Sequence, residues 1–229
     1  MKYTDYTKEE WLYNDHLKVV VLGGTGGVGK KVVDLMSPIH EVLSLGSKDI
    51  DVRDQEAVNR VLYLADPEVL ICLFGKNSNS MLHKIDPEET YQQINTNILG
   101  NINVVNAALK IMREKKFGRI ILASSVLSNK TILGTSIYSG CKSFIETLAR
   151  VAGAENAKYG ITVNCLRMGY MDAGLTYEIP EDFREKIKLT IPSKEFGDCR
   201  NITNVVEMLI DSDYINGTSI DINGGLNGI

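Results

Sequence analysis

The first apolar run of the chain passes directly into a glycine-rich turn and then into a helical pattern. "KVVVL" at 18–22 has strand length, and "GGTGGVGKKVVDLM" follows it. Glycine allows a tight turn and lets an anion approach the N–H groups at a helix N-terminus. Strand, turn and helix in this order predict a nucleotide phosphate site. Its candidate contacts are Gly23, Thr25, Gly27, Val28 and Gly29.

Five further apolar segments of strand length follow, at 42–45, 69–74, 119–123, 161–166 and 218–222. Most are separated by longer stretches with helical periodicity. This alternation predicts an α/β fold in which a doubly wound parallel sheet lies between two helical layers, a three-layer αβα Rossmann fold. No Pro/Gly/Ser linker divides the chain, so we expect one domain over 18–229 and an N-terminal arm over 1–17.

The bulk properties exclude several classes of partner. A net charge of -4 and a pI near 5.5 give no basic surface for nucleic acid or an anionic membrane. No apolar run approaches the roughly 18 residues of a membrane span. Residues 1–17 carry acids and aromatics where a secretory signal needs an apolar core. We therefore expect a cytoplasmic protein with neither a nucleic acid nor a membrane partner.

The cysteines indicate neither a metal site nor a disulfide framework. Cys72, Cys141, Cys165 and Cys199 are far apart, form no C-x-x-C pair and have no histidine at ligand spacing. We expect reduced thiols and no metal.

The second apolar segment leads into "GSKDIDVRD". Sites that select NAD usually place an acidic side chain near this strand end, whereas the 2′-phosphate of NADP favours hydroxyls and a cation. Ser47 and Lys48 stand there, which favours NADP. Asp49 is one residue further along, so NAD stays open.

Polar residues in three separate segments point to one crevice. In "SIYSGCKSF", Tyr138 and Lys142 are four residues apart and share a helix face. Ser125 ends the strand segment "ILASSV", and Asn97 lies at the start of a helical stretch. Alone, a Tyr-x-x-x-Lys pair is usually a solvated helix face. In open α/β sheets, however, ligands bind at the carboxyl edge of the strands, where these segments would meet.

Together these features resemble the short-chain dehydrogenase/reductase family in its compact, single-domain form. The resemblance extends over almost the whole chain. It is carried by a G-x-x-x-G-x-G turn at Gly23, Gly27 and Gly29, a D-V pair at Asp51 and Val52, an N-x-x-G segment from Asn97 to Gly100, the set Ser125, Tyr138 and Lys142, "RMGYMDAGL" around Gly169, and the final "IDINGG".

The resemblance implies hydride transfer between the nicotinamide of NAD(P) and a carbonyl or secondary alcohol. Tyr138 would be the proton donor, since the Lys142 cation favours its phenolate form. Ser125 would hydrogen-bond the carbonyl oxygen, Lys142 would also bind the nicotinamide ribose, and Asn97 would hold a proton-relay water.

Other implied positions surround the cofactor and the substrate. Asp51 and Val52 would lie near the adenine, and Gly75 and Gly169 beside the cofactor. Residues 169–192 would form a substrate lid. The resemblance also implies a homodimer or a homotetramer with two-fold axes. The sequence does not identify the substrate.

The chain departs from the family pattern at several positions. The usual N-N-A-G is Cys72–Gly75, the threonine before the turn is Leu22, and the proline before Gly169 is Met168. Two alternatives stay open. One is a nucleotide-sugar epimerase or dehydratase, which uses the same Tyr and Lys, although only about sixty residues follow "RMGY" to form a substrate lobe. The other is a catalytically silent dinucleotide-binding sensor or scaffold.

Overall fold

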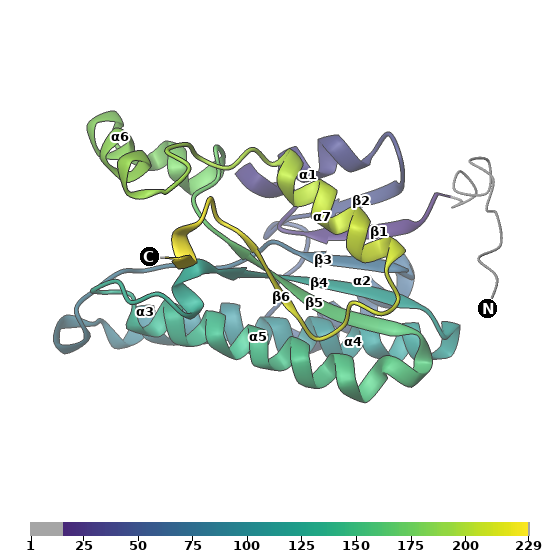
Figure 1. The fold of residues 1–229 in the computed structure, drawn as a ribbon. Coiled ribbons are helices and arrows are strands. Elements are labelled where there is room, and N and C mark those ends of the chain that lie inside the picture. The colour runs from purple at the N-terminus through teal and green to yellow at the C-terminus, as the bar shows by residue number, and fades with distance from the viewer. Residues whose placement is uncertain (1–15, 229) are drawn as a thin grey trace, which may run out of the picture.

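The computed structural model describes residues 16–228 and shows one parallel sheet between two helical layers (Figure 1). The strand order in these residues is β2-β1-β3-β4-β5-β6. The strands are β1 (Lys18–Leu22), β2 (Glu41–Leu45), β3 (Val69–Cys72), β4 (Gly118–Ser125), β5 (Ile161–Met168) and β6 (Ser219–Ile222). The helices are α1 (Gly27–Met36), α2 (Gln55–Ala65), α3 (Pro87–Ile94), α4 (Gly100–Lys115), α5 (Ser136–Asn156), α6 (Glu181–Thr190) and α7 (Arg200–Asp211). This confirms the predicted α/β class and Rossmann-like topology.

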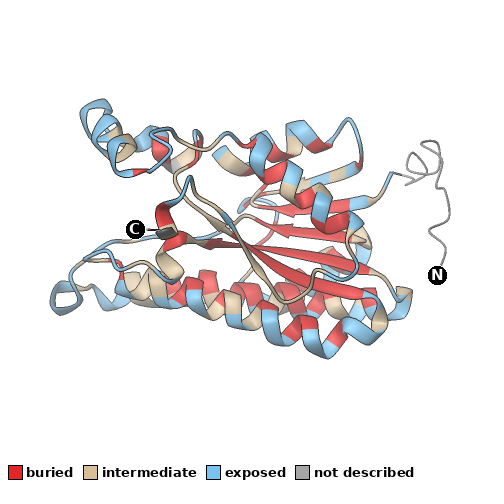
Figure 2. Ribbon diagram, in the orientation of Figure 1, coloured by how far each residue is buried: buried red, intermediate tan, exposed pale blue. Residues whose placement is uncertain are grey.

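The two faces of the sheet bury different sets of side chains, because successive strand residues point to opposite faces. Val19 and Val21 pack with residues of α1 and α7. Val20 and Leu22 pack with residues of α2, α4 and α5. The central strands are buried on both faces (Figure 2), which explains why they read as continuous apolar runs.

Capping residues set the starts of the helices that flank the site. The Asp54 carboxylate accepts the N–H groups of Glu56 and Ala57 at the start of α2. Asp86 caps α3 in the same way, and Pro87 follows at the first helical position, where its missing N–H costs nothing. These caps fix where the loops after β2 and β3 end.

The loops that follow β1, β3, β4 and β5 meet at the carboxyl edge of the sheet (Figure 1). β1 and β3 are adjacent in the sheet although β2 lies between them in sequence, because β2 pairs with the other edge of β1. The order in which successive strands are added to the sheet therefore reverses between β1 and β3. Such a switch point is where open α/β sheets bind ligands. The fold therefore brings the predicted site segments to one edge.

Most of the predicted arm, 1–17, lies outside the described residues, as does residue 229. Among the described helices, none is both long and apolar enough to span a bilayer. Within residues 16–228 no group of three or more His, Cys, Asp or Glu side chains could hold a metal ion.

Candidate active site

The turn after β1 has the form of a phosphate cradle. Gly23 has φ +82°, a left-handed conformation that favours glycine, and its N–H donates to Leu45 O at 2.8 Å. A Cβ on Gly29 would collide with the Gly23 carbonyl, so the helix start packs directly on the turn. No side chain caps the N-terminus of α1. Its N–H groups and the helix dipole therefore suit an anion.

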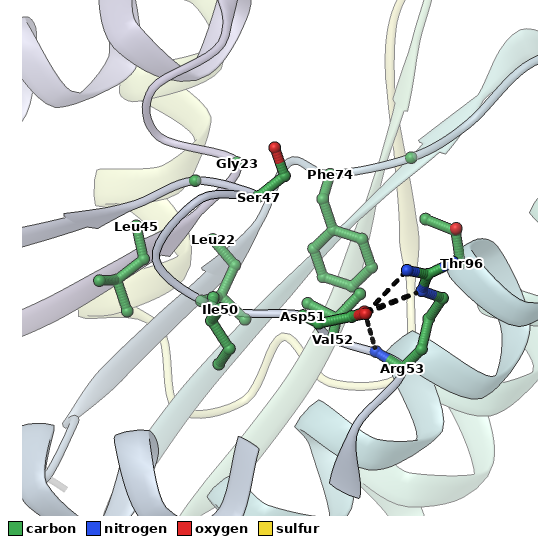
Figure 3. Close-up of a pocket in the computed structure, with 12 residues that line it drawn as sticks. Leu22, Gly23, Leu45, Ser47, Ile50, Asp51, Val52, Arg53, Phe74 and Thr96 are labelled. Carbon is green, nitrogen blue, oxygen red and sulfur yellow. Dashed lines mark hydrogen bonds and ion pairs between the residues drawn. The ribbon is translucent and has the colours of Figure 1, made fainter. Parts of the chain in front are cut away.

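A pocket of about 270 Å³ lies beside this turn, at the ends of β1, β2 and β3 (Figure 3). Its lining includes Leu22, Leu45, Ile50, Val52 and Phe74. A pocket with apolar walls next to a phosphate cradle fits the adenosine half of a dinucleotide. The predicted positions Gly23, Ser47, Asp51, Val52 and Gly75 all line it.

No carboxylate at the end of β2 is available for a ribose. A Cβ on Gly46 would collide with the Thr25 hydroxyl, so position 46 has no room for an acidic side chain. The Asp49 carboxylate accepts the Gly46 N–H at 2.7 Å and is thereby turned back onto its own loop. Ser47 and Lys48 are exposed at this edge. Each of these features favours a 2′-phosphate over a bare ribose.

Tyr138 and Lys142 lie on one face of α5, as their spacing predicts. The Lys142 ammonium is buried, donates to Ala123 O at 2.6 Å and lies 5.4 Å from the centroid of the Tyr138 ring. Tyr138 itself is half-buried. The fold therefore holds a buried ammonium beside a phenol ring at the carboxyl edge of the sheet.

Asn97 lies inside a π-helical turn, Asn95–Leu99, and is fully buried. Its side chain makes two hydrogen bonds to Lys76, accepting from N at 3.0 Å and donating to O at 2.7 Å. Its own carbonyl accepts from Asn101 Nδ2 at 2.8 Å. A water held by Asn97 would therefore compete with Lys76 for the side-chain amide and with Asn101 for the carbonyl.

Two amide side chains hold the loop after β3, where the usual N-N-A-G asparagine is absent. Asn97 holds the loop after β3 through Lys76, and Gln93 Nε2 donates to Ser78 O at 3.1 Å further along that loop. A Cβ on Gly75 would lie 3.0 Å from Asn97 Oδ1 and 3.6 Å from Lys142 Nζ. Gly75 therefore keeps the space between these two side chains open.

Ser125 ends β4, and its Oγ accepts the Leu127 N–H at 3.2 Å. Its neighbour Ser124 points to the other face of the sheet and donates to Glu146 at 2.6 Å. Glu146 also pairs with Arg167 of β5 at 2.6 Å, with side chains only 15% and 16% exposed. Burial raises the pKa of Glu146, but hydrogen bonds from Arg167 and the serines outweigh it and hold that pKa below its ordinary value.

The segment predicted as a lid, residues 169–192, leaves β5 at Gly169, whose N–H donates to Ile222 O at 2.9 Å. It contains α6 and touches the phosphate turn, where a Cβ on Gly27 would collide with Gly174. Lys31 of α1 donates to Asp172 O at 2.5 Å and to the Tyr177 hydroxyl at 3.3 Å. We refer to residues 169–192 as the lid segment.

The four cysteines are free and buried. Cys141 is next to Lys142, yet burial raises the pKa of its thiol, and Lys142 only partly offsets this. Cys72 and Cys165 lie under the site, and burial likewise raises the pKa of both thiols. None of these three is held as a reactive thiolate.

The comparisons with known proteins agree with this geometry. Residues 28–227 match the family model described as enoyl-(acyl carrier protein) reductase. The chain belongs to the short-chain dehydrogenase/reductase family. It is accordingly an NAD(P)-dependent oxidoreductase, as predicted.

Relatives within the short-chain dehydrogenase/reductase family are similar over nearly their full length. The chain is 28% identical to the 3-oxoacyl-[acyl-carrier-protein] reductase MabA of Mycobacterium tuberculosis, covering 91% of this chain and 92% of the relative. It is 26% identical to an acetoacetyl-CoA reductase of Synechocystis, covering 90% and 94%. A small-chain dehydrogenase solved in complex with NADPH has a TM-score of 0.85 at 22% identity, covering 94% of this chain and all of that one.

Several contacts of the site were not predicted from the sequence. They are the Asn101 bond to Asn97, the Arg53 pair with Asp51, and the Lys31 contacts to the lid segment. Glu146 did have a signal. It follows Tyr138 and Lys142 at the next four-residue step on the same face of α5.

Proposed function

We propose that the protein is an NADP(H)-dependent reductase of 3-oxoacyl thioesters, with Tyr138 as its general acid. The observation that carries the chemistry is the buried Lys142 ammonium, fixed on Ala123 O beside the Tyr138 ring. A fixed cation in a site of low dielectric stabilises developing negative charge on a phenol better than a solvated one does.

The nicotinamide, when bound, supplies the hydride. Ser125 Oγ and the Tyr138 hydroxyl both donate hydrogen bonds to the substrate carbonyl oxygen, which orients it and stabilises the charge that develops there. Tyr138 then gives its proton to that oxygen, and Lys142 stabilises the phenolate left behind. Lys142 has further N–H groups for the nicotinamide ribose. Asn97 would hold a water that relays protons toward bulk solvent, on the second lone pair of the carbonyl that also accepts from Asn101.

The choice of NADP rests on the end of β2. Thr25 and Ser47 offer hydroxyls and Lys48 a cation, while Gly46 has no room for a carboxylate. Titration calorimetry tests the choice. Binding of NAD(H) tenfold tighter than NADP(H), a difference of about 1.4 kcal/mol, would contradict it.

The acyl thioester is supported by the relatives, which are named as 3-oxoacyl and acetoacetyl-CoA reductases. A second pocket agrees with an acyl chain. It has a volume of about 500 Å³ and lies between the loops after β3 and β4. Its apolar lining comes from Met81, Leu82, Leu127, Ile132 and Leu133.

The test is the oxidation of NADPH, followed by nicotinamide absorbance, with acetoacetyl-CoA and with a longer 3-oxoacyl-CoA. We expect turnover with both and a lower KM for the longer chain, because more apolar surface is buried. Turnover of simple ketones but of neither thioester would exclude the proposed substrate class. No turnover with any carbonyl, despite NADPH binding, would favour the silent sensor.

We further propose that the lid segment closes when the cofactor binds. We also propose that the protein is a homodimer or homotetramer in the cytoplasm. Exposed apolar residues on the π-helical turn, α4 and α5 support the assembly, among them Leu99, Ile102 and Val151. Light scattering at micromolar concentration checks it, and a monomer would exclude it.

A further inference from the structure

The adenosine pocket has apolar walls and one pair of opposite charges. Asp51 and Arg53 are the charged side chains among its lining residues (Figure 3). Val52 and Phe74 form apolar lining next to them, and a Cβ on Gly100 would lie 2.8 Å from Val52 and 3.3 Å from Phe74. The wall formed by Val52 and Phe74 is thus tightly packed. The Asp51–Arg53 pair lines a space suited to a flat, uncharged ring.

The Asp51 carboxylate is engaged by Arg53. Its Oδ1 accepts the Arg53 backbone N–H at 3.0 Å and Nε at 2.8 Å, and its Oδ2 accepts Nη2 at 2.7 Å. This bidentate geometry is the strong form of a carboxylate–guanidinium contact. The resemblance assigns Asp51 to the adenine, but here that carboxylate mainly holds the neighbouring cation.

The guanidinium is also held from the other side. Arg53 Nη1 donates to Gln92 Oε1 at 3.0 Å, across 39 residues of sequence. The Arg53 side chain is 44% exposed, so these contacts favour one plane of the group without locking it, and they lower the side-chain freedom that is lost on binding. Because these hydrogen bonds use the edge of the guanidinium, its flat faces stay available for stacking.

We propose that Arg53 stacks on the adenine of the cofactor and determines affinity for its adenosine half. A guanidinium over an aromatic ring gains planar stacking in addition to cation–π attraction, and lysine, a point charge without a plane, cannot supply the stacking. Asp51 and Gln92 then serve as positioning residues that hold the plane of Arg53. The inference rests on the proposed NADP(H) function.

The test measures the binding of NADPH, NADH and reduced nicotinamide mononucleotide, which lacks adenosine, to the wild type, Arg53→Lys and Arg53→Met. We expect both variants to bind NADPH and NADH about tenfold more weakly, by the same factor for each, and to bind the mononucleotide as the wild type does. Arg60→Met, an exposed substitution on α2, is the matched control and is expected to change nothing. Gln92→Met should weaken both dinucleotides about threefold.

Three results would overturn the stacking role. Arg53→Lys could bind NADPH and NADH within about twofold of the wild type, which would show that the charge of residue 53, rather than its planar guanidinium, determines the affinity. The loss could be confined to NADPH, which would make Arg53 a partner of the 2′-phosphate. The mononucleotide could weaken as much as the dinucleotides, which would indicate collapse of the site. A wild type that binds neither dinucleotide would instead refute the proposed function and this inference with it.

Discussion

The site is enclosed by two walls that are held in place differently. The catalytic wall, formed by β4, β5 and α5, is fixed by buried polar contacts, with Lys142 only 3% exposed. The lid segment meets α1 through exposed contacts, from Lys31 to Asp172 O and to the Tyr177 hydroxyl. Buried polar contacts are costly to break, whereas exposed ones contribute little. The comparison teaches that the catalytic wall is preorganised by buried contacts, while the contacts of α1 with the lid segment are exposed and contribute little stability.

Tyr138→Phe tests whether the catalytic wall carries the chemistry. The ring stays in place and only the hydroxyl is lost, so we expect single-turnover hydride transfer to fall by about 10²- to 10⁴-fold while NADPH binding stays within about twofold. Lys142→Met should impair both, because the ammonium serves the phenol and the ribose. A Tyr138→Phe protein that keeps more than about a tenth of the rate would show that the hydroxyl is not the essential acid.

Ser125→Ala removes one hydrogen-bond donor to the carbonyl oxygen. We expect turnover to fall by about a hundredfold or more, the loss typical of one oxyanion donor. Ser124→Ala is the neighbouring control. Its hydroxyl faces Glu146, so it should lower stability but leave the rate constant of hydride transfer nearly unchanged. Equal kinetic losses in both variants would mean that the strand end, rather than the Ser125 hydroxyl, matters.

Glu146→Leu tests how firmly the catalytic wall is fixed. It leaves Arg167 buried without its main partner, and we expect the free energy of unfolding to fall by about 3–5 kcal/mol. The double variant Glu146→Leu, Arg167→Met should recover most of that loss, since no buried charge is then left unpaired; Asp221, which also pairs with Arg167, is 46% exposed. Urea denaturation measures both. A single variant that loses less than about 1 kcal/mol would place this pair among the weak surface contacts.

The pH dependence of stability provides a further test of the same pair. The pKa of Glu146 is depressed in the folded state, so its contribution is complete above the ordinary glutamate pKa and is lost as pH falls through the depressed value. Urea denaturation from about pH 7 to about pH 3 should show the advantage of the wild type over Glu146→Gln shrinking in acid. If the stability advantage of the wild type instead grew as pH fell, this would contradict a depressed pKa of Glu146 in the folded state.

Lys31→Met tests the weaker wall and has the smallest expected effect. It removes the bonds from α1 to Asp172 O and to the Tyr177 hydroxyl, both at the surface. We expect NADPH to dissociate about three- to fivefold faster in stopped flow, with the hydride-transfer step unchanged. Tyr177→Phe removes the Lys31 bond to the hydroxyl and the hydroxyl's own bond to Asp172 O, but it keeps the bond from Lys31 to Asp172 O and should show a smaller change. A loss in the hydride-transfer step itself would mean that the lid segment also positions the reacting groups.

The fold was predictable because its signals are local. The apolar runs and the glycine turn are contiguous in sequence, and each predicted strand is observed, although β3 ends earlier, at Cys72, and β4 and β5 extend further, to Ser125 and Met168. Tyr138 and Lys142 were predictable because one helical turn separates them. No periodicity announces the contact of Lys31 with Asp172, 141 residues away, or the Arg53 bond to Gln92. Such contacts depend on the packing of loops rather than on the pattern of any one segment.

The strand order has a consequence for how the protein folds. β1 pairs with both β2 and β3, so the central part of the sheet requires residues 18–72 to have crossed over twice. The turn at Gly23 depends on both pairings, since it bonds to Leu45 O, and Leu73 N–H donates to Leu22 O. Pairing between parallel strands that are far apart in sequence is slow, because the chain loses loop-closure entropy before it gains the contacts between the strands. The cradle therefore forms only once β1 has paired with both β2 and β3, so cofactor binding reports on the completed centre of the sheet.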